Sequence, residues 1–292
     1  MTIDQTRNLA DEQLTRAVLA SFEGAKSERF REIAQSLVRH LHDFVADVQL
    51  TEEEWFQAID FLTRTGHITD DKRQEFILLS DVLGISMLVI GINNRKPPEA
   101  TQATVFGPFF VEGAPEFENG DDIGRGAPGR PCFMSGRVLS TDGSAIPGAR
   151  IDVWQADEDG FYDVQYSNLE EPRGRGQLRS DGEGRFWFWS VLPEAYPIPS
   201  DGPVGELLEA GGRGPMRPAH VHFKVEAQGF ETLITHVFVE GDEHLDKDAV
   251  FGVKSELIAP FQRHEPGSAP DGSARDEPFY TLDYDLVLVP TG

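Results

Sequence analysis

Two histidines that stand two residues apart, His220 and His222, are the side chains whose spacing most directly suggests chemistry. In a strand, residues i and i+2 point to the same face about 7 Å apart, so two imidazoles can bind one metal ion there. Arg217 precedes the pair and adds a positive charge, which favours an anion bound nearby. A His-x-His pair on the polar face of a strand also arises by chance, so the spacing alone leaves a structural role open.

Five other histidines have weaker patterns. His40 and His42 lie on a predicted helix, where residues two apart point to nearly opposite sides and cannot chelate one ion together. We expect three more to be solvated residues of polar loops: His67, His244 and His264.

The remaining ligands of a metal at this pair would have to be hard. The single cysteine, Cys132, is not in reach, so oxygen and imidazole are the donors available. Tyr162 and Tyr196 lie upstream in loops or at strand ends, although a tyrosine with a packed ring and a solvated hydroxyl is the commoner role. A lone cysteine also fits a reducing compartment, and the N-terminus has no secretory signal pattern, so we expect a cytoplasmic location.

Three separated motifs carry a resemblance to a known family. They are Val153-Trp154-Gln155-Ala156-Asp157 with Gly160-Phe161-Tyr162, then Leu192-Pro193 with Tyr196-Pro197-Ile198-Pro199, then Arg217-Pro218-Ala219-His220-Val221-His222. Together, in this order, they resemble the intradiol ring-cleavage dioxygenases over nearly the whole chain. The resemblance implies a helical N-terminal region that serves dimerisation, followed by a β-sandwich catalytic domain.

The resemblance also implies a cofactor and a reaction. One non-haem Fe(III) per subunit would be held by two tyrosines and two histidines, which correspond here to Tyr162, Tyr196, His220 and His222. Tyr196 would leave the metal and accept a substrate proton, and Arg217 would stabilise negative charge on the ring. The expected substrates are O2 and hydroxyquinol (benzene-1,2,4-triol), cleaved to 3-hydroxy-cis,cis-muconate or maleylacetate in aromatic catabolism. Catechol or chlorocatechol is the alternative substrate.

A substrate pocket follows from the same resemblance. Its expected wall consists of Leu78, Asp81, Val105, Phe106, Gly107, Pro108, Phe109, Ile198, Pro199 and Val250. A carboxylate inside an apolar helix is costly unless it is partnered, so we hypothesise that Asp81 accepts a hydrogen bond from the third hydroxyl of hydroxyquinol. A salt bridge to a nearby arginine is the alternative. His236, on a neighbouring predicted strand, either orients the substrate or a ligand, or is simply a buried histidine.

The elements that must position these residues change character near residue 100. Apolar residues at helical spacing predict a helix of about 20 residues over 30–48. Thr51 followed by Glu54 predicts a capping box that opens a second helix, ending at Gly66. The apolar run 76–92 is marginally short for a membrane span, and we interpret it as one buried helix. The predicted helical dimerisation domain is 1–100.

Beyond residue 100, apolar residues alternate with a period of two. Strands are predicted around Val138 and over 151–154, 186–189, 220–225, 234–239 and 282–289, with long loops at 107–131, 163–178 and 193–216. Helices followed by strands, without alternation, favour an α+β fold with an antiparallel β-sandwich, here the catalytic domain 101–292.

Composition restricts the partners. The 292 residues carry 26 basic and 50 acidic side chains, a net charge of −24, which excludes nucleic acid as a partner because phosphate backbones would be repelled. Surplus apolar surface in the first hundred residues predicts a homodimer through the N-terminal helices. By resemblance, a phospholipid could bind at the dimer interface, and the run 76–92 would permit it.

Two other functions stay open at this point. Gly214, His220, His222 and Glu226 resemble the opening of the first cupin motif, which would give a divalent metal on a jelly roll, although the rest of that motif is missing. The non-enzymatic alternative is a metal-free β-sandwich binding module.

Overall fold

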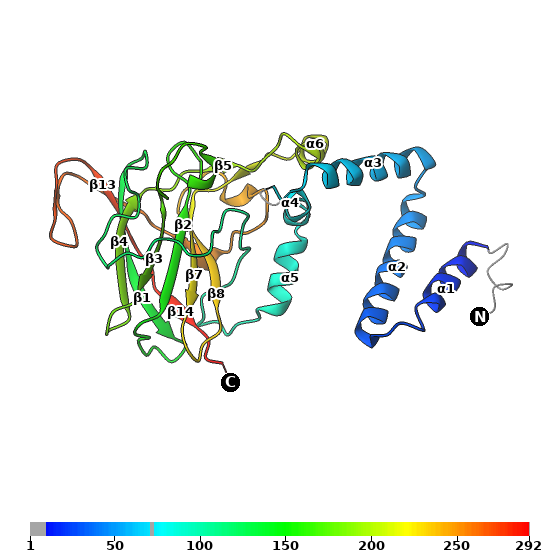
Figure 1. Cartoon of the computed structure of the whole chain (residues 1–292), viewed down its shortest axis with the longest axis horizontal. Helices are drawn as coiled ribbons and strands as arrows, with labels where there is room; N and C mark the ends of the chain where they lie inside the picture. Colours follow the sequence, from blue (N-terminus) through cyan, green and yellow to red (C-terminus); the bar gives the residue numbers. More distant parts are fainter. Residues whose placement is uncertain (1–9, 71–72, 292) are drawn as a thin grey trace. The chain divides into compact units, whose positions relative to one another are not determined.

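The computed structural model describes residues 10–70 and 73–291, and the chain divides between Arg64 and Thr65 into two compact units (Figure 1). The first unit contains α1 (Asp11–Ser21), α2 (Glu28–Val48) and most of α3 (Glu52–Ile68). Two side-chain hydrogen bonds join α1 to α2. The Gln35 amide donates to the Leu19 carbonyl at 2.9 Å, and the Thr15 hydroxyl lies 2.8 Å from His42 Nδ1.

The helix predicted over 30–48 is confirmed as α2. Ser27 caps its first turn, because its hydroxyl accepts a hydrogen bond from the Phe30 N–H at 3.2 Å. The helix ends where Gln49 adopts a left-handed conformation with φ of 49°. No residue of α2 is buried, and its apolar stripe is therefore exposed: Phe30, Ile33, Leu37, Leu41, Phe44, Val45 and Val48.

The predicted capping box at the start of α3 is also confirmed. The Glu54 N–H donates to the Thr51 hydroxyl at 3.2 Å, and the Thr51 N–H donates to the Glu54 carboxylate at 2.9 Å. The helix runs to Ile68, two residues beyond Gly66, where it was expected to end.

The interpretation of 76–92 as one buried helix is wrong. The run forms two helices, α4 (Glu75–Val82) and α5 (Ile85–Asn93), because Gly84 adopts a left-handed φ of 72° that breaks the helix. Only α4 has buried residues, and α5 has none. Within the described residues, no single helix meets the length and hydropathy of a bilayer span, and the pair α4 and α5, bent by 77°, meets them only jointly.

A β-sandwich makes up most of the second unit. In its described residues, one five-stranded sheet has the order β3-β2-β7-β8-β9, and the other has the order β10-β13-β1-β14 with β4 paired to β1. The bounds of the first sheet are β2 (Arg150–Gln155), β3 (Arg175–Arg179), β7 (His220–Glu226), β8 (Leu233–Val239) and β9 (Ile258–Ala259). Those of the second are β1 (Pro131–Ser140), β4 (Arg185–Val191), β10 (Gln262–His264), β13 (Phe279–Asp283) and β14 (Leu286–Leu288).

The predicted α+β class with an antiparallel sandwich is confirmed, with parallel pairing at β1 with β13, β1 with β14, and β8 with β9. One continuous core fills the space between the two sheets. Met134 and Phe188 contribute from one sheet, and Ile151 and Val221 from the other. This alternation of buried side chains follows the period of two seen in the sequence.

Two predicted loops contain regular structure. The segment 163–178 includes most of β3, which pairs with β2, and the segment 193–216 includes β5 (Tyr196–Pro197) and α6 (Pro203–Ala210) and ends at β6 (Met216–Arg217). The predicted strand 282–289 is the end of β13 followed by β14. Helix α4 packs against α6 through Leu78 and Val204, in a cluster separate from the sandwich core. The division expected at residue 100 stays a prediction, since α4 and α5 belong to the second unit.

Candidate metal centre

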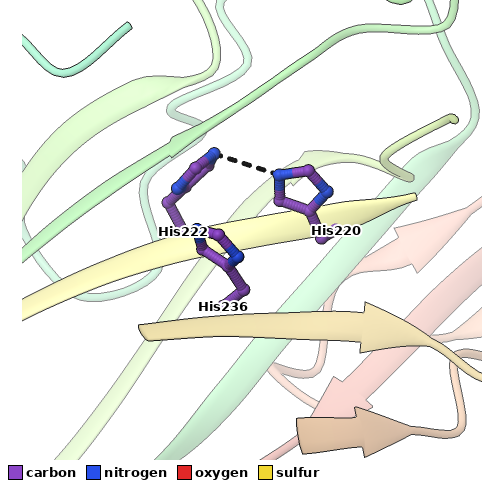
Figure 2. Close-up of side chains that lie close together, drawn as sticks. All are labelled: His220, His222 and His236. Atoms are coloured by element: carbon purple, nitrogen blue, oxygen red, sulfur yellow. Dashed lines mark hydrogen bonds between the residues drawn. The ribbon is translucent and has the colours of Figure 1, made fainter. Parts of the chain in front are cut away.

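Three buried histidines converge on the neighbouring strands β7 and β8. His220 and His222 extend from the same face of β7, and the strand pairing places His236 of β8 opposite His222. Figure 2 shows the three rings side by side, with His220 and His222 directed toward each other. The Nε2 atoms of His220 and His222 are 3.1 Å apart, and the ring centroids of His222 and His236 are 4.2 Å apart. Within the described residues, these three side chains bring ligand atoms within 4.8 Å of one another.

Two tyrosine hydroxyls complete this cluster. The Tyr162 oxygen lies 2.8 Å from His222 Nε2 and 3.4 Å from His220 Nε2. The Tyr162 hydroxyl donates to that of Tyr196 at 3.3 Å. Tyr162 follows β2 and Tyr196 opens β5, so residues far apart in the sequence meet here. We refer to His220, His222, Tyr162 and Tyr196 as the four-donor cluster.

The histidines of the cluster are neutral, with lone pairs available. Burial, followed by the Arg217 guanidinium, lowers the pKa of His220 to about 3. Burial and the neighbouring His236 and His220 lower the pKa of His222 well below its ordinary value. The His220 Nδ1–H donates to the Pro218 carbonyl at 2.7 Å, which leaves Nε2 as the unprotonated nitrogen facing the cluster.

Tyr162 is held protonated when no cation is present. Burial, followed by the adjacent Tyr196 hydroxyl, raises the pKa of Tyr162 well above its ordinary value. A cation among the four donors would reverse this preference, since a metal ion stabilises the charged form of its ligand.

Aromatic contacts and a buried ion pair fix the orientation of the donors. Trp154 stacks on His222 with centroids 4.6 Å apart and planes 15° apart, and Phe109 stacks on Tyr162 at 4.4 Å and 24°. Asp163, next to Tyr162, forms an ion pair with Arg175 of β3 in which both side chains are almost fully buried. These contacts leave the donors little freedom to rotate away from one another.

Arg217 places a buried positive charge beside the cluster. Its Nη1 lies 3.3 Å from His220 Nε2, and its side chain is only 3% exposed. Burial opposes its charge, but Asp248 and the tyrosines outweigh burial and raise its pKa. A permanent cation here provides an electrostatic partner for an anion bound at the cluster.

The four-donor cluster fits a hard transition-metal ion. It combines two imidazole nitrogens with two phenol oxygens, which is the donor chemistry that suits iron rather than zinc–thiolate sites. Glu226, the carboxylate needed by the cupin alternative, lies at the far end of β7, where it pairs with Lys224 at 3.2 Å and Arg150 at 3.7 Å. The divalent His/Glu site is therefore wrong.

A cavity of about 210 Å³ lies beside the cluster. Phe109, which stacks on Tyr162, forms part of its wall. Five of the expected pocket residues line it: Leu78, Asp81, Pro108, Phe109 and Pro199. Four further lining residues, Arg73, Gln74, Glu75 and Ile77, were missed because the end of a loop and the first turn of a helix carry no pattern of a pocket.

The other expected pocket residues lie around the cavity rather than on its surface. Val105, Ile198 and Val250 are buried with Leu78 in one apolar cluster. Phe106 packs its ring 5.8 Å from that of Trp154. Gly107 lies against His222, and a Cβ there would be 3.2 Å from the imidazole Cε1.

Asp81 is buried at the cavity wall. Burial raises its pKa above the ordinary value, and the hydroxyl of Ser86 acts in the opposite direction. Among the described residues, no arginine lies within ion-pair distance of Asp81, so the predicted alternative of a salt bridge to arginine is wrong. A buried carboxyl beside the apolar side chains of this wall is suited to hydrogen bonding a polar group on a ligand.

His236 is fully buried beside Arg217. Its Nδ1 lies 3.4 Å from Arg217 Nη2, and its Nε2 has no hydrogen-bond partner among the described residues. Burial, then His220 and Arg217, lower its pKa well below the ordinary value. It therefore presents a neutral ring to the cluster, in contact with both His220 and His222.

Comparisons with known proteins agree with this arrangement. The sequence matches the family described as Dioxygenase over residues 105–290 and the family described as Catechol dioxygenase N terminus over residues 27–101. It is 55% identical to the 6-chlorohydroxyquinol 1,2-dioxygenase of Cupriavidus pinatubonensis, over 95% of this chain and 97% of that protein. Identity to the hydroxyquinol 1,2-dioxygenase of Nocardioides simplex is 52%, over 96% of each chain.

A solved structure is similar throughout. The hydroxyquinol 1,2-dioxygenase of Pseudomonas putida superposes with a TM-score of 0.91 at 45% sequence identity, covering 96% of this chain and 99% of that one. The likeness therefore extends over both compact units.

Proposed function

The chain belongs to the intradiol ring-cleavage dioxygenases, and on that premise we propose that it cleaves hydroxyquinol between its adjacent hydroxylated carbons. Both atoms of O2 would enter the product, 3-hydroxy-cis,cis-muconate, or maleylacetate after tautomerisation. The observation that carries this proposal is the four-donor cluster beside a buried cation and a small cavity.

The four-donor cluster is proposed to hold one Fe(III) per subunit. Two imidazole nitrogens and two phenol oxygens within 3.4 Å of their neighbours support this assignment. A ferric ion, when bound, supplies the Lewis acidity and electron-accepting capacity that make an aromatic diol reactive toward dioxygen.

The residues around the cluster have separate proposed roles. Tyr196, as the phenolate that a bound ferric ion would stabilise, would accept a proton from a substrate hydroxyl; its phenol oxygen lies 3.3 Å from that of Tyr162 in the cluster. Arg217 stabilises the negative charge that develops on the ring carbon next to it. His236 supports the orientation of the two cluster histidines, which its ring contacts.

Asp81 is the proposed determinant for the third hydroxyl of hydroxyquinol. Its carboxyl is buried at the wall of the cavity, whereas Leu78, Pro108, Phe109 and Pro199 present apolar surface. A site built to hydrogen-bond a substrate hydroxyl discriminates strongly against an analogue that lacks it. Val105, Phe106, Gly107, Ile198 and Val250 are proposed to support this wall.

The remaining proposals concern assembly and location. We propose that residues 1–100 serve dimerisation and residues 101–292 serve catalysis, because the exposed apolar stripe of α2 requires cover. The exposed apolar residues of α5 would accept a phospholipid acyl chain. A cytoplasmic location is consistent with the single buried thiol of Cys132.

Oxygen consumption tests the proposed reaction. The iron-loaded protein is supplied with hydroxyquinol, catechol or 4-chlorocatechol under ¹⁸O2, and the product is weighed by mass spectrometry. We expect one O2 consumed per hydroxyquinol, two labelled oxygens in the product, and a lower kcat/KM for the two catechols. A higher kcat/KM for a catechol would make that catechol, rather than hydroxyquinol, the proposed substrate. If no diol led to oxygen consumption, the metal-free binding module would be favoured.

A further inference from the structure

We propose that Asp248 is the positioning residue of Arg217, a role that rests on the proposed function. Asp248 lies between η3 (Leu245–Lys247) and the turn that leads to η4 (Ser255–Leu257). Its side chain is 2% exposed and that of Arg217 is 3% exposed. The guanidinium donates through Nε to Oδ1 at 3.1 Å and through Nη2 to Oδ2 at 3.4 Å, so the carboxylate holds it by two atoms.

The carboxylate is itself fixed by the backbone. The Val250 N–H donates to Oδ1 at 3.2 Å, and the Gly252 N–H donates to Oδ2 at 2.8 Å. The chain approaches so closely that a Cβ on Gly252 would be 3.0 Å from Arg217 Nη2 and 3.1 Å from Asp248 Oδ2. The backbone therefore fixes the carboxylate of Asp248, and the close approach of Gly252 restricts movement of the guanidinium.

This anchor determines where the positive charge points. With Nε and Nη2 held by Asp248, Nη1 is left facing His220 Nε2 at 3.3 Å. Asp81 is the other buried carboxyl nearby, but it forms no ion pair with Arg217. Asp248 therefore neutralises the desolvated cation and aims its remaining donors at the cluster, where substrate charge is proposed to develop.

Two effects of Asp248 are separable by kinetics. The hydrogen bond to Arg217 affects transition-state stabilisation and so kcat. The hydrogen bond to Val250 shapes the turn that packs with Leu78 beside the cavity, so a role of Asp248 in this turn alone would change KM rather than kcat. All four hydrogen-bond partners of the carboxylate are donors, so the amide nitrogen of an asparagine cannot replace either oxygen.

Asp248→Asn is the test variant, and Asp246→Asn is its matched control. Asp246 is exposed on η3, two residues away, and its substitution removes the same charge. We expect Asp248→Asn to lower kcat on hydroxyquinol by about 10-fold or more, with KM changed less than about 3-fold. Asp246→Asn should leave both constants within about 2-fold. Equal values for the two variants would overturn the inference.

Arg217→Gln and the double variant Arg217→Gln/Asp248→Asn locate the effect. If Asp248 acts through Arg217, adding Asp248→Asn to Arg217→Gln lowers kcat by less than about 2-fold. A full second loss in the double variant, or a normal kcat in Arg217→Gln, would overturn the inference. A normal kcat in Arg217→Gln would, in addition, remove Arg217 from the proposed mechanism.

Thermal unfolding of the metal-free variants gives a readout that does not depend on ring cleavage. Breaking the buried pair should lower the Tm of Asp248→Asn by about 5 °C or more relative to Asp246→Asn, and the double variant should be no less stable than Asp248→Asn. Additive losses would overturn the coupling. If the wild-type protein cleaves no diol, the proposed function fails, and this series still decides whether Asp248 anchors Arg217.

Discussion

Helix α2 exposes apolar side chains, whereas strand β7 buries polar ones. None of the 21 residues of α2 is buried, although apolar side chains cover one of its faces. Strand β7 buries two histidines completely, in a position where most strands bury apolar residues. A macromolecular partner would remove the first of these mismatches between side chains and surroundings, and a bound cation would remove the second.

Substitutions in the two regions should therefore change different properties of the protein. Association with another chain would bury the exposed apolar face of α2. Substitutions on this face should therefore change assembly and leave ring cleavage unchanged. A bound cation would pair with the buried nitrogen and oxygen atoms of the four-donor cluster. Substitutions of these side chains should therefore abolish metal binding and leave assembly unchanged.

Tyr162→Phe should have the largest effect, because it removes a donor from the four-donor cluster without changing the ring packing on Phe109. We expect the iron content to fall well below one per chain and kcat/KM on hydroxyquinol to fall by about 1,000-fold. Elemental analysis and oxygen uptake measure these values. Tyr166→Phe is the control, since Tyr166 lies in the same loop and its hydroxyl donates to Asp157 at 2.7 Å, away from the cluster.

Tyr162→Phe with full iron content would remove that residue from the ligand set. Loss of iron in Tyr166→Phe as well would indicate general damage to the loop rather than loss of a donor.

Leu41→Lys tests the exposed face of α2. A charge in the centre of the apolar stripe should weaken the dimer by about 100-fold or more, because each protomer loses the burial of one leucine and must desolvate an ammonium. Sedimentation velocity over a range of concentrations measures the shift to monomer. Asp43→Lys, two residues along α2 on the opposite side, should leave the dimer unchanged. A wild-type protein that is already monomeric contradicts the account.

Asp81→Ala tests the substrate preference. Removing the buried carboxyl should lower kcat/KM for hydroxyquinol by about 10- to 100-fold and change that for catechol by less than about 3-fold. Catechol, which lacks the third hydroxyl, serves as the internal control. An equal loss on the two substrates would exclude the specificity role of Asp81.

Gly107→Ala should have the smallest effect. Gly107 has a φ of 75°, and a Cβ there meets His222 Cε1 at 3.2 Å; Gly113 has a φ of 76° and no atom within 4 Å of the added Cβ. Both alanine variants should lose about 1 kcal/mol of stability from the left-handed backbone. Only Gly107→Ala should also lower kcat, by about 10-fold, as His222 shifts. Equal kcat values would show that His222 tolerates the displacement.

Local rules predicted the elements, and the motifs predicted the residues that converge. The apolar spacing gave α2 because a helix presents residues three and four apart on one face, and Thr51 with Glu54 sufficed to place the start of α3. Tyr162, Tyr196, His220 and His222 were found together because three motifs occur in one order, although no spacing rule places residues up to 60 apart in one cluster.

Features that depend on long-range partners could not be predicted. The segment that forms β3 contains arginines and glycines typical of a loop, yet it is a strand because it pairs with β2 and because Asp163 neutralises the buried Arg175. The break between α4 and α5 depends on the left-handed φ of Gly84, which an apolar run conceals. Asp248 carries no motif, and only its contact with Arg217, 31 residues away, reveals it.

The most direct test of the central claim, that the four-donor cluster holds ferric iron, is the metal content and visible spectrum of the protein purified from iron-replete medium. We predict about one iron per chain and a visible absorption band from tyrosinate-to-iron charge transfer, both lost in Tyr162→Phe. A protein with no iron and no visible band, after expression with iron available, would contradict the account.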